Sequence, residues 1–319
     1  MRLHTNTQDF NELIRLTATH FNILPEFIEK DYWITLILNN LSQSSHANSV
    51  VFKGGTSLTK GYSLINRFSE DIDIALLDEK LTGNALKTKI RKIEKNITAD
   101  LTEIEEQGVT RKGSVYRKSL FQYPSNINSR LVNNVQKRII VEINSFANPY
   151  PFVRQKITSF IAEFLTATNQ IEVIQEYNLQ QFSLNILDKR RTMLEKLVSL
   201  IRFSFSENPT RELAKKIRHF YDLYYLAKDE ECAKYLQSPE FQKDLSELLT
   251  HDKQEFDEPQ GWQTKMFKDS PLITDFPNLW TNLRSTYQNE LTPLAFSEIP
   301  NEKLIEESFV EIIKKVVEK

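Results

Sequence analysis

The chain has 319 residues, with 41 Lys and Arg against 43 Asp and Glu and a formal net charge of −2, so its total charge does not indicate a nucleic-acid-binding protein. Its one cysteine, Cys232, excludes an internal disulfide and a cysteine-based zinc site. The N-terminus lacks the apolar segment of a signal peptide, and no apolar run approaches the roughly 18 residues of a membrane span, so we expect a cytoplasmic protein without membrane association.

Two amphipathic helices are predicted before the first strand. Residues 9–20 have helical spacing of apolar side chains, and a second helix begins near Pro25 and continues to Leu41. The second helix contains the run Glu29-Lys30-Asp31 next to two aromatic residues. Considered alone, this run is interpreted as an exposed, salt-bridged face beside an aromatic core.

Residues 50–57 combine a short strand with a glycine pair. Val50, Val51 and Phe52 favour β-structure, and Gly54-Gly55 follows at once, where positive φ and close approach to a ligand are permitted. Thr56 and Ser57 are predicted at the N-cap of the next helix. Backbone amides at such a helix start favour phosphate binding. The alternative is a plain turn.

An Asp-x-Asp pair follows in a predicted strand. Alternation places Asp71 and Asp73 on one face and Ile72 and Ile74 on the other. Two neighbouring carboxylates repel each other unless a cation lies between them, and hard oxygen ligands favour Mg²⁺ or Mn²⁺. Alone, the pair could be a solvated strand face, but its combination with the glycine pair favours a functional site.

This segment resembles the first motif of the DNA polymerase β-like nucleotidyltransferases, and more closely that of the AbiEii/AbiGii-type toxins, which include MenT-like nucleotidyltransferases. Those families have a GG[ST] turn followed by Asp-x-Asp, and residues 67–73, RFSEDID, resemble their arginine-, serine- and aspartate-containing run. The Glu-Lys-Asp run at residues 29–31 also resembles the family, which implies that it braces the active-site wall. Residues 57–70 exceed the usual spacing by about one helical turn, which we expect to lengthen the helix.

Glu142 is the third acidic candidate, because it lies in an apolar predicted strand where a carboxylate needs a partner or a metal. The resemblance implies a third metal ligand on a strand beside the Asp-x-Asp strand, and Glu142 is the best positional match. The alternative is an exposed glutamate at a sheet edge. The elements predicted in this region are a helix at 81–104, a strand at 112–123, a polar connection at 126–134, a strand at 138–146, a helix at 151–168 and a strand at 181–187.

After Asp188 the composition favours helices almost exclusively. We therefore expect an α+β fold in which residues 1–188 form a nucleotidyltransferase domain, with a mixed β-sheet flanked by helices. Residues 189–319 would form a helical domain that completes the active-site cleft. The predicted helices of this part are 192–205, 211–227, 240–249 and 302–317.

Three residues of the helical part are candidates. Lys196 has the ordinary interpretation of a surface lysine, but it matches the family's EKL motif, whose lysine contacts the triphosphate. Arg202 is predicted near the same helix face. Asp222 matches the acid of a later motif, where it would orient Lys196 or a substrate hydroxyl, although a simple ion pair with Arg218 four residues earlier is the alternative.

The resemblance implies a Mg²⁺-dependent nucleotidyltransferase toxin of a bacterial toxin–antitoxin or phage-defence (abortive infection) system. It would transfer nucleotides from a nucleoside triphosphate to RNA, foremost the 3′ end of tRNA, and so block translation. Its neutralising partner would be an AbiEi-like antitoxin encoded nearby. The implied metal ligands are Asp71, Asp73 and Glu142; the implied catalytic residues are Asp71, Asp73, Lys196 and Asp222; the implied nucleotide-binding residues are Gly54, Gly55, Thr56, Ser57, Lys196 and Arg202.

Local basic clusters are predicted to contact the RNA backbone. Each could equally be a solvated face. The clusters are Arg111-Lys112, Arg117-Lys118, Lys137-Arg138, Lys189-Arg190-Arg191 and Lys215-Lys216 with Arg218.

Other functions remain open. The chain could be a catalytically inactive nucleotidyltransferase fold that serves as a binding partner. A glycosyltransferase also uses Asp-x-Asp to bind a nucleotide sugar, but it does not require a GG[ST] turn. A haloacid dehalogenase-type phosphatase normally has Thr or Val two residues after the pair, where this chain has Ala75.

Overall fold

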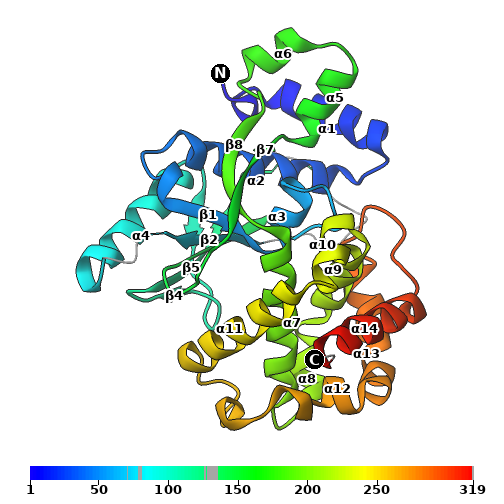
Figure 1. The fold of residues 1–319 in the computed structure, drawn as a ribbon. Helices are drawn as coiled ribbons and strands as arrows, with labels where there is room; N and C mark the ends of the chain where they lie inside the picture. Colours follow the sequence, from blue (N-terminus) through cyan, green and yellow to red (C-terminus); the bar gives the residue numbers. More distant parts are fainter. Residues whose placement is uncertain (70, 78–80, 126, 128–135, 318–319) are drawn as a thin grey trace. The chain divides into compact units, whose positions relative to one another are not determined.

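The computed structural model describes residues 1–69, 71–77, 81–125, 127 and 136–317 (Figure 1). The chain divides into two compact units. The first comprises residues 1–63 and 68–187, and the second comprises residues 64–67 and 188–319. In the described part, no helix is both long and apolar enough to span a membrane.

The first unit is built on a mixed sheet. Eight strands of the described residues form it, in the order β3-β5-β6-β2-β1-β8-β7, with β4 paired to β5. Strand β2 is antiparallel to β1 and parallel to β6, and β1 is parallel to β8, so the predicted mixed sheet is confirmed. The strands are β1 Val50–Lys53, β2 Asp71–Leu76, β3 Thr102–Ile104, β4 Arg111–Lys112, β5 Tyr116–Gln122, β6 Arg138–Asn144, β7 Phe152–Ile157 and β8 Phe182–Leu187.

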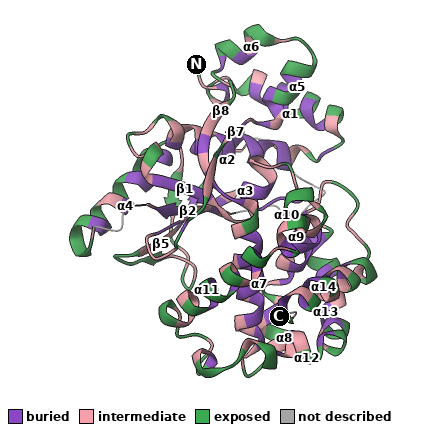
Figure 2. Ribbon diagram, in the orientation of Figure 1, coloured by how far each residue is buried: buried purple, intermediate pink, exposed green. Residues whose placement is uncertain are grey.

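Helices cover this sheet, as predicted for an α+β fold. Helix α2 contacts α4 and β8, while α4 contacts β6. Most residues of α2 are buried, whereas the outer side of α4 is exposed (Figure 2). The helices of this unit are α1 Thr7–Phe21, α2 Pro25–Gln43, α3 Gly54–Lys60, α4 Gly83–Ile97, α5 Phe160–Ala167 and α6 Ile171–Glu176, with 3₁₀ turns at Leu3–Thr5 and Ala47–Ser49.

The second unit is helical in its described residues, and α9 lies at its centre. Helix α9 contacts α7, α10, α13 and α14. Its Phe220 ring lies 4.8 Å from the ring of Phe309 and 5.3 Å from that of Trp280. The helices are α7 Lys189–Ser204, α8 Pro209–Ala214, α9 Ile217–Lys228, α10 Glu230–Leu236, α11 Pro239–Glu255, α12 Pro271–Thr274, α13 Phe276–Leu291 and α14 Glu302–Val317, with 3₁₀ turns at Trp262–Thr264 and Phe267–Asp269.

Two long predicted helices are wrong in part. The predicted helix at 151–168 begins as strand β7, whose backbone pairs with β8, and becomes helical only after Ser159, whose side chain caps α5 by accepting from the Ala162 amide. The predicted helix at 81–104 ends at Ile97, and residues 102–104 form β3 against β5. In both places, pairing with a neighbouring strand satisfies the backbone groups that a longer helix would have used.

Two further boundaries differ. The excess spacing before Asp71 does not lengthen α3, which ends at Lys60; it lies in the connection that follows. The single helix predicted at 211–227 is broken between α8 and α9 at Lys215-Lys216, where no proline or glycine marks the break. Most of the polar connection predicted at 126–134 lies outside the described residues.

Candidate active site

The Asp-x-Asp pair lies on an interior strand of the sheet. In the register, Asp73 is opposite Lys53 of β1 on one side and Glu142 of β6 on the other. Residues directly opposite one another in a sheet share a face, so these three side chains form a row in which two neighbouring carboxylates follow one ammonium. Ile72 and Ile74 are fully buried on the other face, as the alternation predicted.

Gly54 adopts the positive φ that the glycine pair predicted, with a value of 79°. The position also needs glycine for a second reason, because a β-carbon there would overlap the carboxylate of Asp73. The first glycine of the pair therefore lets the start of α3 approach the candidate metal ligand.

Thr56 and Ser57 do not occupy the N-cap, and this prediction is wrong. Helix α3 begins at Gly54, with Lys53 as its N-cap residue, so both hydroxyl residues lie within its first turn. Both side chains are buried and donate to backbone carbonyls: Thr56 to the carbonyl of Asp71, and Ser57 to that of Gly54 at 2.8 Å. Thr56 thus ties α3 to the beginning of β2. A phosphate-binding role for Gly55 and these two residues stays a prediction.

Glu142 is placed beside Asp73, as the sequence order suggested, and it does not lie at the edge of the sheet. Its carboxylate pairs with Lys118 Nζ at 2.7 Å and accepts a hydrogen bond from the Tyr116 hydroxyl at 2.7 Å, both from β5. Within the described residues, no group of three or more His, Cys, Asp or Glu side chains is arranged to hold a metal ion. The role of Glu142 as a metal ligand stays a prediction.

The pKa values of Tyr116 and Lys118 report the negative charge on this face. Burial, followed by the charges of Glu142 and Asp73, raises the pKa of the Tyr116 hydroxyl far above its usual range. Burial opposes the charged form of Lys118, but the bond to Glu142 and the nearby carboxylates outweigh it and raise the pKa of this ammonium. The face therefore favours bound cations, which is the condition for a divalent metal site.

The Glu-Lys-Asp run of α2 is buried rather than exposed, so its interpretation as a solvated face is wrong. Glu29, Lys30 and Asp31 are each no more than 2% exposed. Burial raises the pKa of Glu29 to about 7, despite a hydrogen bond from Ser125 at 2.7 Å. Lys30 donates to the carbonyl of Gln136 at 3.1 Å.

Asp31 has a bracing position within this run. One carboxylate oxygen pairs with Lys60, in the last turn of α3, at 2.6 Å. The other accepts from the amide of Phe160, at the start of α5, at 2.9 Å. Asp31 therefore connects α2, α3 and α5, and it fixes the helix that begins at Gly54. The bracing of an active-site wall, which the family resemblance implied, stays a prediction.

Lys196 and Asp222 lie together in the second unit. Lys196 Nζ contacts Asp222 Oδ2 at 2.7 Å, and both residues are buried. Asp222 is also bound by Arg67, so its carboxylate is not used by Arg218 as the simple ion-pair interpretation proposed. Lys196 is not a surface lysine. The contact is compatible with Asp222 orienting Lys196, and their catalytic roles stay predictions.

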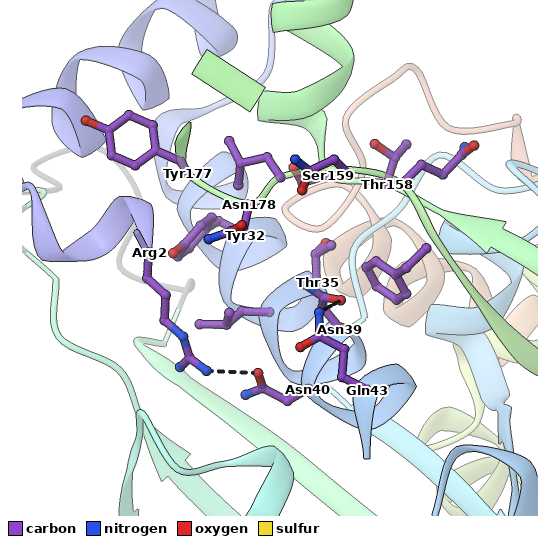
Figure 3. Close-up of a pocket in the computed structure, with 15 residues that line it drawn as sticks. Arg2, Tyr32, Thr35, Asn39, Asn40, Gln43, Thr158, Ser159, Tyr177 and Asn178 are labelled. Atoms are coloured by element: carbon purple, nitrogen blue, oxygen red, sulfur yellow. Dashed lines mark hydrogen bonds between the residues drawn. The ribbon is translucent and has the colours of Figure 1, made fainter. Parts of the chain in front are cut away.

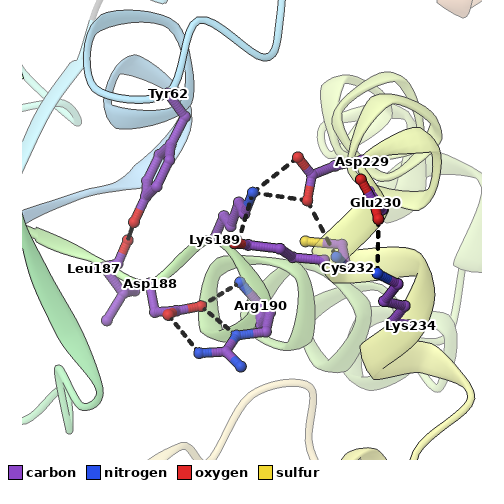
Figure 4. Close-up of polar contacts among 10 residues, drawn as sticks. Tyr62, Leu187, Asp188, Lys189, Arg190, Asp229, Glu230, Cys232 and Lys234 are labelled. Atoms are coloured by element: carbon purple, nitrogen blue, oxygen red, sulfur yellow. Dashed lines mark hydrogen bonds and ion pairs between the residues drawn. The ribbon is translucent and has the colours of Figure 1, made fainter.

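The start of α7, which carries Lys196, is fixed by charged groups (Figure 4). Asp188 caps the helix by accepting from the Arg190 amide at 2.8 Å, and the Arg190 guanidinium binds the same carboxylate. Lys189 pairs with Asp229 at 2.8 Å, and Asp229 caps α10 through the amide of Cys232. Helix α7 is thereby held against the junction of α9 and α10, about two turns before Lys196.

Arg202 lies in an aromatic environment. Its guanidinium carbon is 4.0 Å from the ring centre of Phe256 and 5.8 Å from that of Trp262, and Nη1 is 3.8 Å from a carboxylate oxygen of Asp252. Burial lowers the pKa of Arg202, partly offset by Asp252. These contacts stabilise α7 against α11, and nucleotide binding by Arg202 stays a prediction.

Several residues of the predicted RNA-binding clusters are paired with acids. Such pairs reduce the positive charge that a phosphate backbone would meet. RNA contact by these clusters stays a prediction that the ion pairs do not support. The pairs are Lys112 with Glu103 and Glu105, Arg117 with Glu94, Lys118 with Glu142, Arg138 with Glu106, Lys189 with Asp229, Arg190 with Asp188, and Lys215 with Glu212.

A separate cavity of about 390 Å³ lies in the first unit, between the N-terminal segment, α2 and the chain leading into β8 (Figure 3). No predicted site residue lines it. Its polar side chains bind one another: Arg2 donates to Asn40 at 3.1 Å, and Gln43 donates to Asn39 at 3.2 Å. This cavity is therefore not assigned as the active site.

The sequence pattern assigned no site role to Lys60, Tyr116 and Lys118 of the first unit, or to Arg67 of the second. Arg67 carried a signal, because it belongs to the run that resembles the family motif, but it was given no role. The partnership of Lys118 with Glu142 depends on the register of β5 against β6, for which the chain has no local signal.

A protein-family model described as "Nucleotidyl transferase AbiEii toxin, Type IV TA system" matches residues 36–311. Among solved structures, this chain is similar to "MenT4, nucleotidyltransferase toxin Rv2826c from Mycobacterium tuberculosis H37Rv". The identity is 16% and the TM-score 0.48, and the match covers 94% of this chain and 98% of that chain. No curated protein matches this chain. The family match includes Asp71, Asp73, Lys196 and Asp222, whereas the run at residues 29–31 precedes it.

Proposed function

Because the chain belongs to the AbiEii nucleotidyltransferase toxin family of type IV toxin–antitoxin systems, we propose that it transfers a nucleotide from a nucleoside triphosphate to RNA. The proposed acceptor is the 3′ end of tRNA in the cytoplasm, and the proposed result is a block of translation. The observation that carries the proposal is the location of Asp71 and Asp73 on one face of β2, with Gly54 shaped to admit the Asp73 carboxylate.

The donor set on this face fits a hard divalent cation. Asp71 and Asp73 supply carboxylate oxygens, and Glu142 lies opposite Asp73. Mg²⁺ or Mn²⁺ held by these residues would lower the pKa of the attacking hydroxyl and neutralise the leaving pyrophosphate.

The residues of the chain supply positioning and charge. Lys196 is proposed to bind the triphosphate, because its ammonium has three donors and Asp222 holds it by one contact. The Asp31 to Lys60 pair would keep α3, and with it Gly54, aligned against β2. Phosphoryl transfer depends largely on such positioning and electrostatic stabilisation.

The RNA acceptor and the antitoxin partner are proposed from family membership and not from surface charge. Toxin–antitoxin membership implies a cognate antitoxin, and we propose an AbiEi-like regulator encoded next to the toxin. If this is correct, expression of the toxin alone should arrest bacterial growth, and co-expression of the neighbouring gene should restore it. Growth that continues without the antitoxin would contradict the toxin assignment.

The transfer reaction can be tested directly. The protein is incubated with Mg²⁺, total RNA and each labelled nucleoside triphosphate in turn, and RNA is resolved by size. Wild type should label tRNA-sized RNA, Asp71→Asn and Asp73→Asn should not, and the exposed control Glu298→Gln should match wild type. Labelling that persists in both aspartate variants would overturn the mechanism. Transfer from a nucleotide sugar instead would identify the glycosyltransferase alternative.

A further inference from the structure

A short segment of the N-terminal half is anchored in the second unit. Residues 64–67 precede β2 in the chain but belong to the second unit. Arg67 forms a backbone bridge with Ala295, and the amide of Phe296 donates to the carbonyl of Asn66 at 3.0 Å. Ile65 and Arg67 are 1% and 2% exposed. The backbone at Arg67 is therefore fixed independently of what its side chain binds.

The Arg67 side chain binds both oxygens of Asp222. Nε donates to Oδ1 and Nη2 donates to Oδ2, each at 2.7 Å. Lys196 Nζ shares Oδ2 at 2.7 Å. This bidentate geometry is the strong form of the arginine–carboxylate interaction, so Arg67 is the principal partner of Asp222 and Lys196 is the second.

Two cations, Arg67 and Lys196, share the Asp222 carboxylate. Asp222 is fully buried, which disfavours its charged form, but Arg67 and then Lys196 outweigh burial and hold its pKa well below the usual range. His219, one turn earlier on α9, adds no charge at neutral pH, because burial and the neighbouring ammonium of Lys196 hold its pKa well below the usual range. One carboxylate is thus divided between two cations.

We propose that Arg67 is a positioning residue that keeps Lys196 able to bind phosphate. By binding both carboxylate oxygens, Arg67 prevents Asp222 from fully neutralising the Lys196 ammonium, while the shared Oδ2 still fixes where that ammonium lies. Without Arg67, Lys196 and Asp222 would form a closed, neutral ion pair with little attraction for a triphosphate. This inference rests on the proposed function, because it assumes that Lys196 meets the triphosphate.

The test measures the affinity for ATP, and for inorganic tripolyphosphate as a probe without base or sugar. Arg67→Met should weaken both affinities about tenfold, a change of roughly 1.4 kcal/mol. Adding Asp222→Asn to Arg67→Met should restore most of the affinity, because the neutralising carboxylate is then gone. Lys196→Met should weaken binding in every background. In transfer assays, Arg67→Met should raise KM for the nucleotide more than it lowers kcat.

A purely structural role for Arg67 predicts no recovery of affinity in the double variant. A protein that has lost both buried partners would then bind ATP no better than the Arg67→Met single variant. Absence of rescue would therefore overturn the inference. If Arg67→Met does not fold, Arg67→Lys serves: it keeps the charge but not the bidentate contact, so affinity should fall by less than about tenfold, and a larger loss would contradict the proposal. A wild-type protein that neither binds nor transfers any nucleotide would refute the proposed function itself, whereas binding that depends on Lys196 but is not rescued would refute only the inference.

Discussion

The Cα of Gly54 and the carboxylate of Asp73 are in such close contact that a β-carbon on Gly54 would lie 2.1 Å from Asp73 Oδ2. Because Gly54 also has φ of 79°, Gly54→Ala introduces two penalties. The left-handed conformation alone costs roughly 1–2 kcal/mol in an alanine. We expect the overlap to displace the Asp73 carboxylate and abolish nucleotide transfer, measured by RNA labelling.

Gly108→Ala is the matched control for this change. Gly108 has φ of 83°, and no heavy atom lies within 4 Å of its ideal β-carbon. It should therefore lower the free energy of unfolding by about 1–2 kcal/mol and leave transfer intact. Equal activities for the two variants would show that the contact with Asp73 does not matter.

The Asp31 to Lys60 pair should contribute strongly to stability. The two side chains are 2% and 8% exposed, so Asp31→Asn leaves a buried ammonium without its carboxylate. Removing one partner of such a pair costs about 3–5 kcal/mol, which thermal and urea unfolding would measure. Asp31→Asn combined with Lys60→Met should be less destabilised than Asp31→Asn alone. Lys303→Met, at an ion pair exposed to solvent, should leave the melting temperature unchanged.

The buried charge of Asp222 should make the free energy of unfolding depend on pH in the acid range. Its pKa in the folded protein is below the unfolded value of about 4, so its stabilisation is present above that value and disappears as the pH falls through the folded pKa. Asp222→Asn should therefore be less stable than wild type at pH 7, and the difference should shrink below about pH 4. Urea unfolding across this range measures it. A difference that does not change with pH would contradict the charged state assigned to Asp222.

The buried His219 should add a second pH dependence of the free energy of unfolding, closer to neutral pH. Its folded pKa lies well below the unfolded value of about 6.5, because burial and the charge of Lys196 disfavour protonation. The unfolded chain then binds more protons, so wild-type stability should fall as the pH decreases from 7 to 5, by up to about 1.4 kcal/mol per unit. His219→Phe should flatten this slope. A slope that stays the same in His219→Phe would contradict the neutral state assigned to His219.

The sequence was informative where the required pattern is local. The strict alternation of Asp71, Ile72, Asp73 and Ile74 predicted β2 and its two faces correctly. It failed at Phe152–Ile157, because apolar residues there also fit a helical spacing and the true helix follows directly. The buried state of Glu29 to Asp31 could not be seen either, since three consecutive charged residues in a helix normally mark its exposed side.

Contacts between residues far apart in the chain could not be predicted from local sequence patterns. Arg67 and Asp222 are separated by 155 positions, and their contact depends on where the chain returns to itself. The Lys118 to Glu142 pair likewise depends on strand register, since a shift of one residue would move Lys118 to the opposite face. Family resemblance identified Asp222 and Lys196 as candidates, but only the structure shows that Arg67 binds Asp222.

The anchoring of residues 64–67 in the second unit affects how the chain folds during its synthesis. At a synthesis rate of about 5–20 residues per second, Arg67 leaves the ribosome roughly 8–30 s before Asp222 does. During that interval the residues that will bury Arg67 and Ile65 have not yet been synthesised. The second unit can therefore complete its folding only by packing against a segment that was made much earlier. For the same reason, a proteolytic cut between Leu187 and Asp188 would not release two self-sufficient halves, because the N-terminal piece would carry away a buried part of the other.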